Sequence, residues 1–367
     1  MNATLRRFGA SPIAPLLVCH TGAINGLAFD PWQLWAFLRA ELAAFAETPF
    51  RCANGTRATM AHVQTLHPQS VGVERLVPLG TQLLHGVTEL LARAPADLRL
   101  ALILCVPARM ADGGGGTFPQ QRRILERELT SWLAAAQSAR GAPDPVVRTL
   151  ALGHASMAYA LEEIAPLLDR GVDAAIVLGL DTAYDPNWVE HLLATERLFD
   201  GERLDTAIAG EGGALALLAT PDAVARCRWP VLASVSASAT AREAATLDND
   251  VPMMGLALSR CAVAATDALE AQRRPLDWWI TDMTSEPYRV QEFQLAWPRA
   301  SARRMTADGT LHFIASQLGD LGAAAMPTAL CLALEGFARG APVADTCLIT
   351  GSSAGGERGV VLVERAR

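Results

Sequence analysis

The sequence predicts an α/β protein made of two similar halves, and three observations lead to this class. Short apolar runs typical of buried strands alternate with helical segments along the whole chain. Of the 367 residues, 51% are hydrophobic and only 19% are charged, which favours a large and well-packed core. The order of strands and helices in the first part of the chain recurs in the second. We therefore expect an N-terminal half over 1–225 and a C-terminal half over 226–367, related by duplication.

The elements of the first half follow from short apolar runs, which predict strands, and from helical periodicity, which predicts helices. The tight turn Gly153-His154 joins a strand directly to a helix, so this part forms a strand, elbow, helix and strand unit. The glycine run at 113–116 can only be a loop. The expected strands are 15–19, 98–106, 146–152 and 172–178, and the expected helices are 31–46, 120–137 and 155–169.

The second half repeats this logic after a polar stretch at 221–230 that is bracketed by prolines. We place the seam between the halves there, because strand-forming residues give way to it. The expected strands are 230–236, 276–281, 345–350 and 359–364, and the expected helices are 253–272, 287–296 and 321–339.

The distribution of charge argues against nucleic acid as a partner. The net charge of −7 comes from 38 acidic and 31 basic residues that are spread along the chain, without a run of Lys or Arg that could bind phosphates. No apolar segment reaches the roughly eighteen residues of a transmembrane helix. The apolar run near Pro15 is interrupted and makes a poor signal peptide. We therefore expect a cytoplasmic protein.

The cysteines and histidines predict no metal site. The cysteines lie mostly within apolar stretches and lack the density of a secreted disulfide scaffold, so we interpret them as small buried hydrophobic residues in a reducing compartment. His62, His67 and His85 share no ligand spacing. We expect neither a metal nor a cofactor. The seven cysteines are Cys19, Cys52, Cys105, Cys227, Cys261, Cys331 and Cys347.

Several blocks along the chain carry a more specific pattern. They read HASMAYAL at 154–161, GVDAAIVLG at 171–179, LFDG at 198–201, AGEGGA at 209–214, TDMTSEP at 281–287, LGDLGAAA at 318–325 and SSAGG at 352–356. In this order they resemble the nucleophile elbow and its following strand, the GEG segment, the HGT loop, the GH segment and the glycine-rich gate of ketoacyl synthases in the thiolase-like superfamily. The resemblance covers nearly the whole chain.

The resemblance implies a thiolase-like fold, a five-layered αβαβα molecule built from two duplicated halves. It also implies a dimer that pairs through the strand 146–152, either as a homodimer or as a heterodimer with an active ketosynthase homologue. In that family the further partner is an acyl carrier protein.

The three catalytic groups of a condensing enzyme are replaced at the positions that the blocks assign. Condensation needs a thiolate at a helix N-terminus and two neutral histidines that stabilise an enolate. The nucleophile position is His154, and the two histidine positions fall on Asp282 and on Gly319, which Asp320 follows. Ala354 replaces the phenylalanine of the gate. An acyl-imidazole hydrolyses readily, and a carboxylate at 282 would oppose an enolate anion. We therefore expect no condensation.

Two alternatives stay open for His154, an ion pair with Asp282 in its protonated form or a hydrogen bond to a backbone carbonyl. Asp320 is expected to cap the long C-terminal helix, and Glu211 to accept hydrogen bonds from nearby backbone groups. Ser156 has no identifiable base and is better explained as a first-turn helix residue than as a nucleophile. The residues expected around the former active site are Ser156, Met157, Met283, Thr284 and Ser353.

Three functions fit this pattern. The first is a catalytically inactive partner or scaffold subunit that shapes the acyl pocket of an active ketosynthase, as chain-length factors do. The second is a free-standing adaptor on a thiolase scaffold, for example in a bacterial secretion cluster. The third, the least supported, is an acyltransferase or hydrolase with His154 as base, because no nucleophile accompanies it. Neighbouring genes for an intact ketosynthase and a carrier protein would favour the first function, and secretion genes the second.

Overall fold

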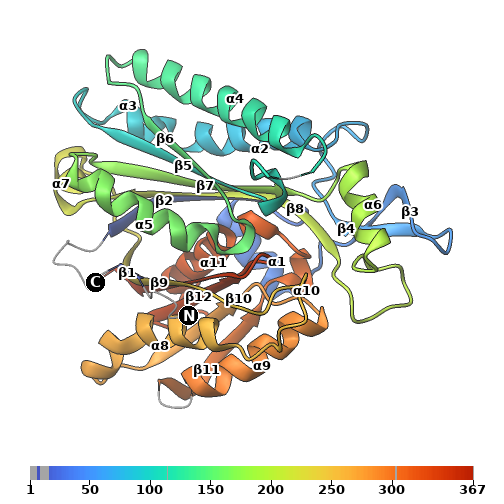
Figure 1. Cartoon of the computed structure of the whole chain (residues 1–367). Coiled ribbons are helices and arrows are strands. Elements are labelled where there is room, and N and C mark those ends of the chain that lie inside the picture. The colour runs from blue at the N-terminus through green and yellow to red at the C-terminus, as the bar shows by residue number, and fades with distance from the viewer. Residues whose placement is uncertain (1–5, 9–15, 114, 302–303, 367) are drawn as a thin grey trace.

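A computed structural model describes residues 6–8, 16–113, 115–301 and 304–366. They form five layers, two sheets that alternate with three layers of helices (Figure 1). One outer layer contains α2 (Val73–Gly86) and α4 (Phe118–Ser138), the other contains α8 (Leu256–Ala271) and α9 (Pro287–Ser301), and α5 (Ser156–Asp169) and α11 (Ala325–Arg339) lie between the sheets. The chain therefore has the expected thiolase-like αβαβα fold.

The two halves have the same strand order. The first group runs β2 (Leu16–Asn25), β8 (Ala209–Ala219), β7 (Ala174–Thr182), β5 (Leu100–Val106) and β6 (Val146–Ala151), and the second runs β9 (Ala233–Arg242), β13 (Glu357–Arg365), β12 (Thr346–Ser352), β10 (Leu276–Thr281) and β11 (Met305–Phe313). If the five strands of each group are numbered 1 to 5 along the chain, both groups have the spatial order 1, 5, 4, 2, 3. Strands β2 and β9 pair antiparallel and join the groups. We infer a duplication from this repeat, and the boundary at 225 stays a prediction.

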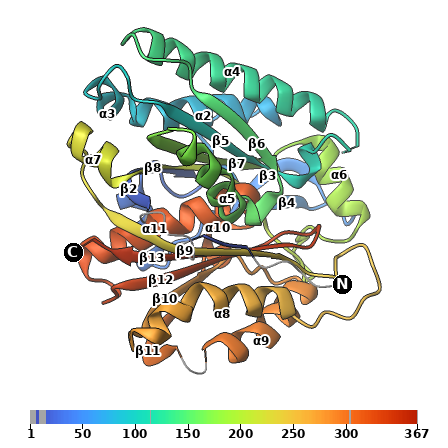
Figure 2. The ribbon, with the colours of Figure 1, turned by 60° about the vertical axis from the view of Figure 1, so that its left-hand side comes forward.

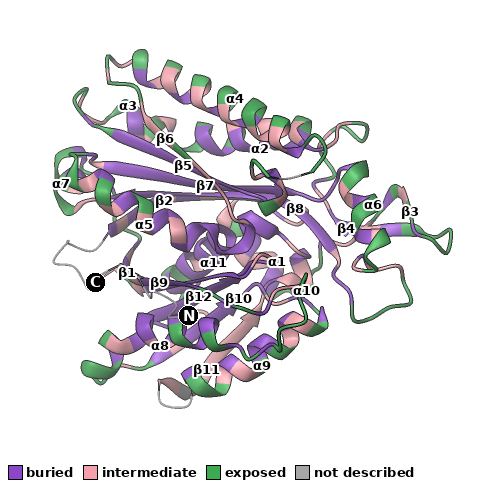
Figure 3. Cartoon of the chain, in the orientation of Figure 1, coloured by how far each residue is buried: buried purple, intermediate pink, exposed green. Residues whose placement is uncertain are grey.

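The central helices are buried because both sheets pack against them. Helix α11 is almost entirely apolar, and twelve of its fifteen residues are buried (Figure 3). Strands β5, β7, β8 and β12 are buried along their whole length, as expected for strands that are covered by helices on both faces. The seven cysteines are free and buried, as the sequence predicts. No helix in the described ranges combines the length and apolar character that crossing a membrane requires.

Several expected boundaries are wrong. The strand expected at 230–236 is β9, which begins at Ala233 and continues to Arg242, and the helix expected at 321–339 begins only at Ala325. Helix α1 (Pro31–Arg39) ends well before residue 46, because Glu41 takes a left-handed backbone with φ 57° and Leu42 donates its N–H to the carbonyl of Phe37, which closes the helix. The expected strand at 15–19 is the start of the longer β2, and its residue 15 lies outside the described residues.

Several further elements have weak sequence signals and were not expected. The seam at 221–230 contains a short helix, which Thr220 caps by accepting a hydrogen bond from the N–H of Ala223. Helix α6 (Pro186–Ala194), together with β3 (Ala46–Arg51) and β4 (Arg57–Ala61), lies at one end of the sheets (Figure 2). These elements are β1 (Arg6–Phe8), β3 (Ala46–Arg51), β4 (Arg57–Ala61), α3 (Thr88–Ala92), α6 (Pro186–Ala194), α7 (Pro221–Cys227) and α10 (Ala315–Leu318).

Two glycines position the central site. Gly153 lies between β6 and α5 with φ 69°, a conformation that strongly favours glycine, and this elbow places His154 at the start of α5. Gly322 precedes α11, and a Cβ atom there would overlap the carboxylate of Asp181. The N-terminal ends of the two central helices therefore meet at the same place, close to the end of β7.

Candidate functional site

Four of the five positions that the resemblance assigns to the catalytic centre contribute a side chain to one region between the halves. His154 comes from the elbow, Asp282 directly follows β10, Asp320 precedes α11, and Ala354 lies in the turn between β12 and β13. Gly319 adds no side chain. Its φ is 66°, and a Cβ atom there would lie 2.8 Å from the carbonyl oxygen of Ile208, so this backbone has no room for a histidine.

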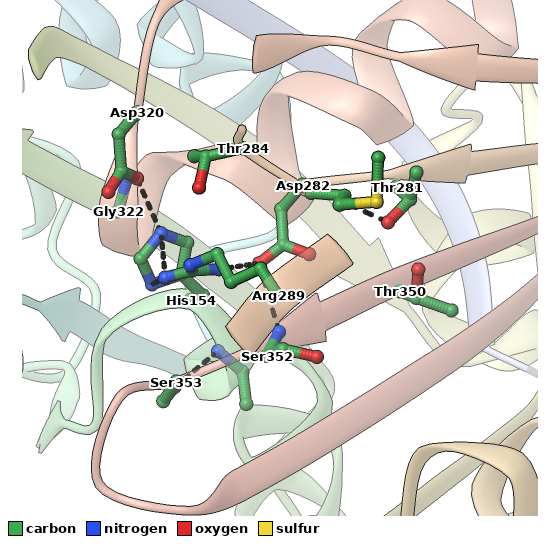
Figure 4. Close-up of polar contacts among 12 residues, drawn as sticks. His154, Thr281, Asp282, Thr284, Arg289, Asp320, Gly322, Thr350, Ser352 and Ser353 are labelled. Carbon is green, nitrogen blue, oxygen red and sulfur yellow. Dashed lines mark hydrogen bonds and ion pairs between the residues drawn. The ribbon is translucent and has the colours of Figure 1, made fainter. Parts of the chain in front are cut away.

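An ion-pair and hydrogen-bond network links three of these residues through Arg289 of α9 (Figure 4). Nε2 of His154 lies 2.5 Å from Oδ1 of Asp320. Nη2 of Arg289 lies 3.2 Å from Nδ1 and 3.1 Å from Nε2 of the same ring. Nη1 of Arg289 lies 3.3 Å from Oδ2 of Asp282, which also accepts the N–H of Ser352 at 2.9 Å. His154, Asp282 and Arg289 are all buried.

The expected partners of His154 were wrong. The imidazole contacts Asp320 and Arg289, neither Asp282 nor a backbone carbonyl. The reason is tertiary: Arg289 lies between His154 and Asp282 and takes the carboxylate of Asp282 for itself. The carboxylate of Asp320 therefore contacts the elbow residue, although the sequence blocks assign the second histidine position to Gly319.

Both ring nitrogens of His154 have polar partners. Asp320 contacts Nε2, and Nη2 of Arg289 lies almost equally close to Nδ1 and to Nε2, so the guanidinium lies against the ring. These contacts leave neither nitrogen free to act as a base.

The two charged neighbours of His154 have shifted pKa values. Burial raises the pKa of Asp320, but the contact with His154 and the charge of Arg289 outweigh it and hold this pKa far below its usual range. Burial lowers the pKa of Arg289, but Tyr288 and the carboxylates of Asp320 and Asp282 outweigh it and raise this pKa. Asp320 is therefore ionised, and Arg289 is charged.

The expected capping role of Asp320 is only partly right. Its Oδ1 accepts the N–H of Gly322 at 3.1 Å, in the single 3₁₀ turn that precedes α11. The long helix itself begins at Ala325 and receives no side-chain cap. The same oxygen contacts His154, so Asp320 joins the start of the second central helix to the start of the first.

Glu211 accepts hydrogen bonds, as expected, and also has a partner that the sequence analysis missed. Its Oε2 accepts the backbone N–H of Val63 at 2.7 Å, which confirms the prediction. Both its oxygens also contact Arg75, with Nε at 2.5 Å and Nη2 at 2.8 Å, and both side chains are buried. This pair stabilises the packing of α2 against the start of β8.

Two cavities adjoin the network, and we call them cavity A and cavity B. Cavity A has a volume of about 100 Å³, and cavity B has a volume of about 400 Å³. Asp320 lines both. Cavity A is lined by Pro107, Ala108, Arg109, Gly153, His154, Asp181, Ala183, Trp188, Leu192, Arg197, Ala207, Ala209, Asp320, Gly322, Ser353 and Ala354. Cavity B is lined by Phe45, Ile208, Met283, Thr284, Ser285, Val290, Phe313, Ala315, Ser316 and Asp320.

The expected pocket residues divide between these cavities and the core. Ser353 lines cavity A, and Met283 and Thr284 line cavity B. Ser156 and Met157 line neither cavity, which corrects their expected position. The hydroxyl of Ser156 donates to the carbonyl of Gly153 at 2.6 Å, and Met157 is buried in the core, because the first turn of α5 directs both side chains inward. Ser156 is thus a first-turn helix residue, as expected.

Arg289 is the functional residue that the sequence analysis missed. It follows the block at 281–287 by two residues, on the first turn of α9, and its side chain is only 2% exposed. One signal could have found it. Two carboxylates and an imidazole at the same buried site require a nearby cation, and Arg289 is the first arginine after Asp282.

Asp320→Asn is expected to change how stability depends on pH. The pKa of Asp320 is lower in the folded chain than in the unfolded chain, where it is about 3.9. Ionised Asp320 therefore stabilises the fold at a pH above about 3.9, and this contribution declines as the pH falls below that value. The variant should be less stable than the wild type by about 1–2 kcal/mol at pH 7. Between pH 5 and pH 3, a range that spans the unfolded pKa of about 3.9, its stability should fall less steeply than that of the wild type. Urea unfolding across this range measures both effects, and parallel curves for the two proteins would contradict the assignment.

Comparisons with known proteins support the fold. No protein-family model matches the chain, and no curated protein matches it. Solved structures do match. A chain from the complex AntDE:AntF, a type II PKS acyl-carrier protein in complex with its ketosynthase, has a TM-score of 0.75 and 11% identity over 97% of this chain and 100% of that chain.

Two further structures give the same result. The ishigamide ketosynthase/chain length factor has a TM-score of 0.73 and 15% identity over 97% of this chain and 100% of that one. An oxazolomycin ketosynthase domain from Streptomyces albus JA3453 has a TM-score of 0.70 and 16% identity over 96% of this chain and 74% of that one. This chain therefore has the thiolase-like fold that these ketosynthases share.

Proposed function

We propose that this chain, which has the fold of ketosynthases, is a catalytically inactive partner or scaffold subunit. The observation that carries this proposal is the network at the former catalytic centre. The elbow presents an imidazole, and neither nitrogen of that ring is free, because Asp320 and Arg289 engage them. No cysteine lines cavity A or cavity B within the described residues. The centre therefore offers no thiolate to hold an acyl chain.

The replaced histidine positions argue in the same direction. Decarboxylative condensation develops negative charge on an enolate, which needs donors and no nearby anion. Here Asp282 and Asp320 bring two carboxylates to the centre, and the guanidinium of Arg289 is held between Asp282 and His154. An enolate in cavity A would lie beside the carboxylate of Asp320. The same arrangement disfavours a hydrolase, since His154 lacks a free nitrogen to act as base.

We further propose that the chain assembles with a second copy or with an active ketosynthase homologue through β6. This strand pairs with β5 on one side and has no strand on its other side among the described residues. Its apolar side chains Val146, Val147 and Leu150 are only partly buried. A partly exposed apolar edge strand favours pairing with another chain. An acyl carrier protein is the further partner that this role implies.

The purified protein is expected neither to release carbon dioxide from a malonyl carrier protein nor to condense acyl thioesters. An intact ketosynthase serves as the positive control, measured by the same carbon dioxide assay. His154→Cys alone should restore no activity, because Asp282 and Asp320 remain where a condensing enzyme needs neutral donors. Carbon dioxide release above the protein-free background by the wild type would overturn the proposal. Rescue by the single change would show that the catalytic positions lie elsewhere.

A further inference from the structure

The backbone holds Asp320 between the two cavities. Ala207 and Ala209 line cavity A, and Ile208 between them lines cavity B, so this segment separates the cavities. Asp320 is bonded to the same segment. Its N–H donates to the carbonyl of Ile208 at 2.8 Å, and its own carbonyl accepts the N–H of Gly210 at 3.1 Å. The carboxylate therefore contributes to the walls of both cavities from a fixed position.

Only one oxygen of this carboxylate is engaged. Oδ1 accepts the N–H of Gly322 and contacts Nε2 of His154, whereas no donor among the residues that the structure describes bonds to Oδ2. The side chain is 21% exposed. Oδ2 therefore keeps its lone pairs available to a molecule in the cavities.

Asp320 also differs from the other carboxylates around the site in its partners. The other carboxylates around the site each pair with an arginine: Arg109–Asp181 at 2.8 Å, Arg197–Glu286 at 2.7 Å and Arg289–Asp282 at 3.3 Å. Asp320, in contrast, forms no ion pair with an arginine among the described residues, and its nearest partner is the ring of His154. Arg289 lies near enough to influence Asp320, but its Nη1 is bonded to Asp282 and its Nη2 faces the ring. The second oxygen of Asp320 therefore has no cationic partner in the described part of the chain.

Cavity B supplies an apolar wall beside this charge. Most of its lining residues are apolar, and its volume of about 400 Å³ accommodates a short hydrocarbon chain. They are Phe45, Ile208, Met283, Val290, Phe313 and Ala315. A carboxylate or phosphate head group would meet the repulsion of Asp320. A head group that donates hydrogen bonds and carries positive charge would instead satisfy Oδ2.

We propose that the junction of cavities A and B binds a primary alkylammonium, with its head group on Oδ2 of Asp320 and its chain in cavity B. The apolar chain adds affinity through burial, and the ammonium adds a charge-assisted hydrogen bond. This inference names a ligand class for the site described under the proposed function. The biological role of the ligand rests on that proposed function, but its binding does not. Binding itself is measured without any partner or any turnover, so the two proposals can fail separately.

Isothermal titration calorimetry with hexylamine, hexanol and hexanoate tests the proposal on the full chain. The three probes share a chain length and differ in the charge of the head group. Hexylamine is expected to bind most tightly and hexanoate least. Asp320→Asn, which keeps the shape of the side chain, should weaken hexylamine by at least about tenfold and leave hexanol nearly unchanged.

Two further variants separate the head group from the chain. Asp205→Asn removes a carboxylate from a surface groove outside both cavities and should leave hexylamine binding unchanged. Ser316→Trp fills cavity B from an exposed position and should weaken hexylamine and hexanol alike. The proposal is overturned if hexanoate binds as well as hexylamine, if wild type binds no hexylamine, or if Asp205→Asn weakens hexylamine as much as Asp320→Asn does.

Discussion

Replacing Arg289 with Met is expected to lower the free energy of unfolding by about 3–5 kcal/mol. The side chain of Arg289 is 2% exposed, and it is the cation that Asp282 and the ring of His154 contact in the described network. Its removal would leave the carboxylate of Asp282 buried, with the N–H of Ser352 as its one remaining partner among the residues that the structure describes. A buried charge without a counter-charge is among the most destabilising changes that one substitution can make.

Urea unfolding of wild type and variant measures this loss, and two controls test its cause. Arg123→Met removes an exposed arginine from α4, outside β6, and should change the stability by less than about 0.5 kcal/mol. Adding Asp282→Asn to Arg289→Met should recover part of the stability, because the second change removes the uncompensated charge. If the double variant is no more stable than the single one, the network does not depend on charge balance.

Thr149→Pro is expected to abolish the dimer or to cause aggregation. Thr149 lies in the middle of β6, and proline there removes one backbone N–H and fixes φ near −65°. Its hydroxyl is buried without a hydrogen-bond partner among the described residues. Because the partly exposed apolar face of β6 is expected to be covered by a partner, subunits that cannot pair should be unstable rather than weakly associated. Size-exclusion chromatography with light scattering measures the change.

Arg148→Pro is the matched control for this variant. Successive N–H groups along a strand point to opposite sides, so one of the two prolines removes a bond to β5 and the other removes a bond to a partner. The two variants should therefore differ, one losing mainly stability of the fold and the other mainly association. A wild type that is a stable monomer at micromolar concentration, with no copurifying partner, would contradict both the edge argument and the proposed role as a partner subunit.

Most of the fold could be predicted from the sequence, because it depends on local patterns. The strand β10 occupies 276–281, as expected, and the elbow, α5 and β7 follow one another as the blocks indicate. Helix α1 was predicted too long, since a left-handed turn at Glu41 carries no sequence signal as clear as glycine. The short elements β3, β4 and α6 were missed because tertiary packing, more than their own periodicity, stabilises them.

The sequence by itself determined that the three positions that the resemblance assigns to the catalytic groups hold His154, Asp282 and Gly319. Their assignment follows from residue identity and the order of the blocks. Only the tertiary structure decided which groups meet. His154, the nearby pair of Asp282 and Arg289, and Asp320 come from three segments that are far apart in the chain, and their pairing depends on how those segments pack and where their side chains point. Arg289 could therefore separate His154 from Asp282, and Asp320 could occupy the place expected for its neighbour, because contacts between distant segments are set by packing and not by spacing along the sequence.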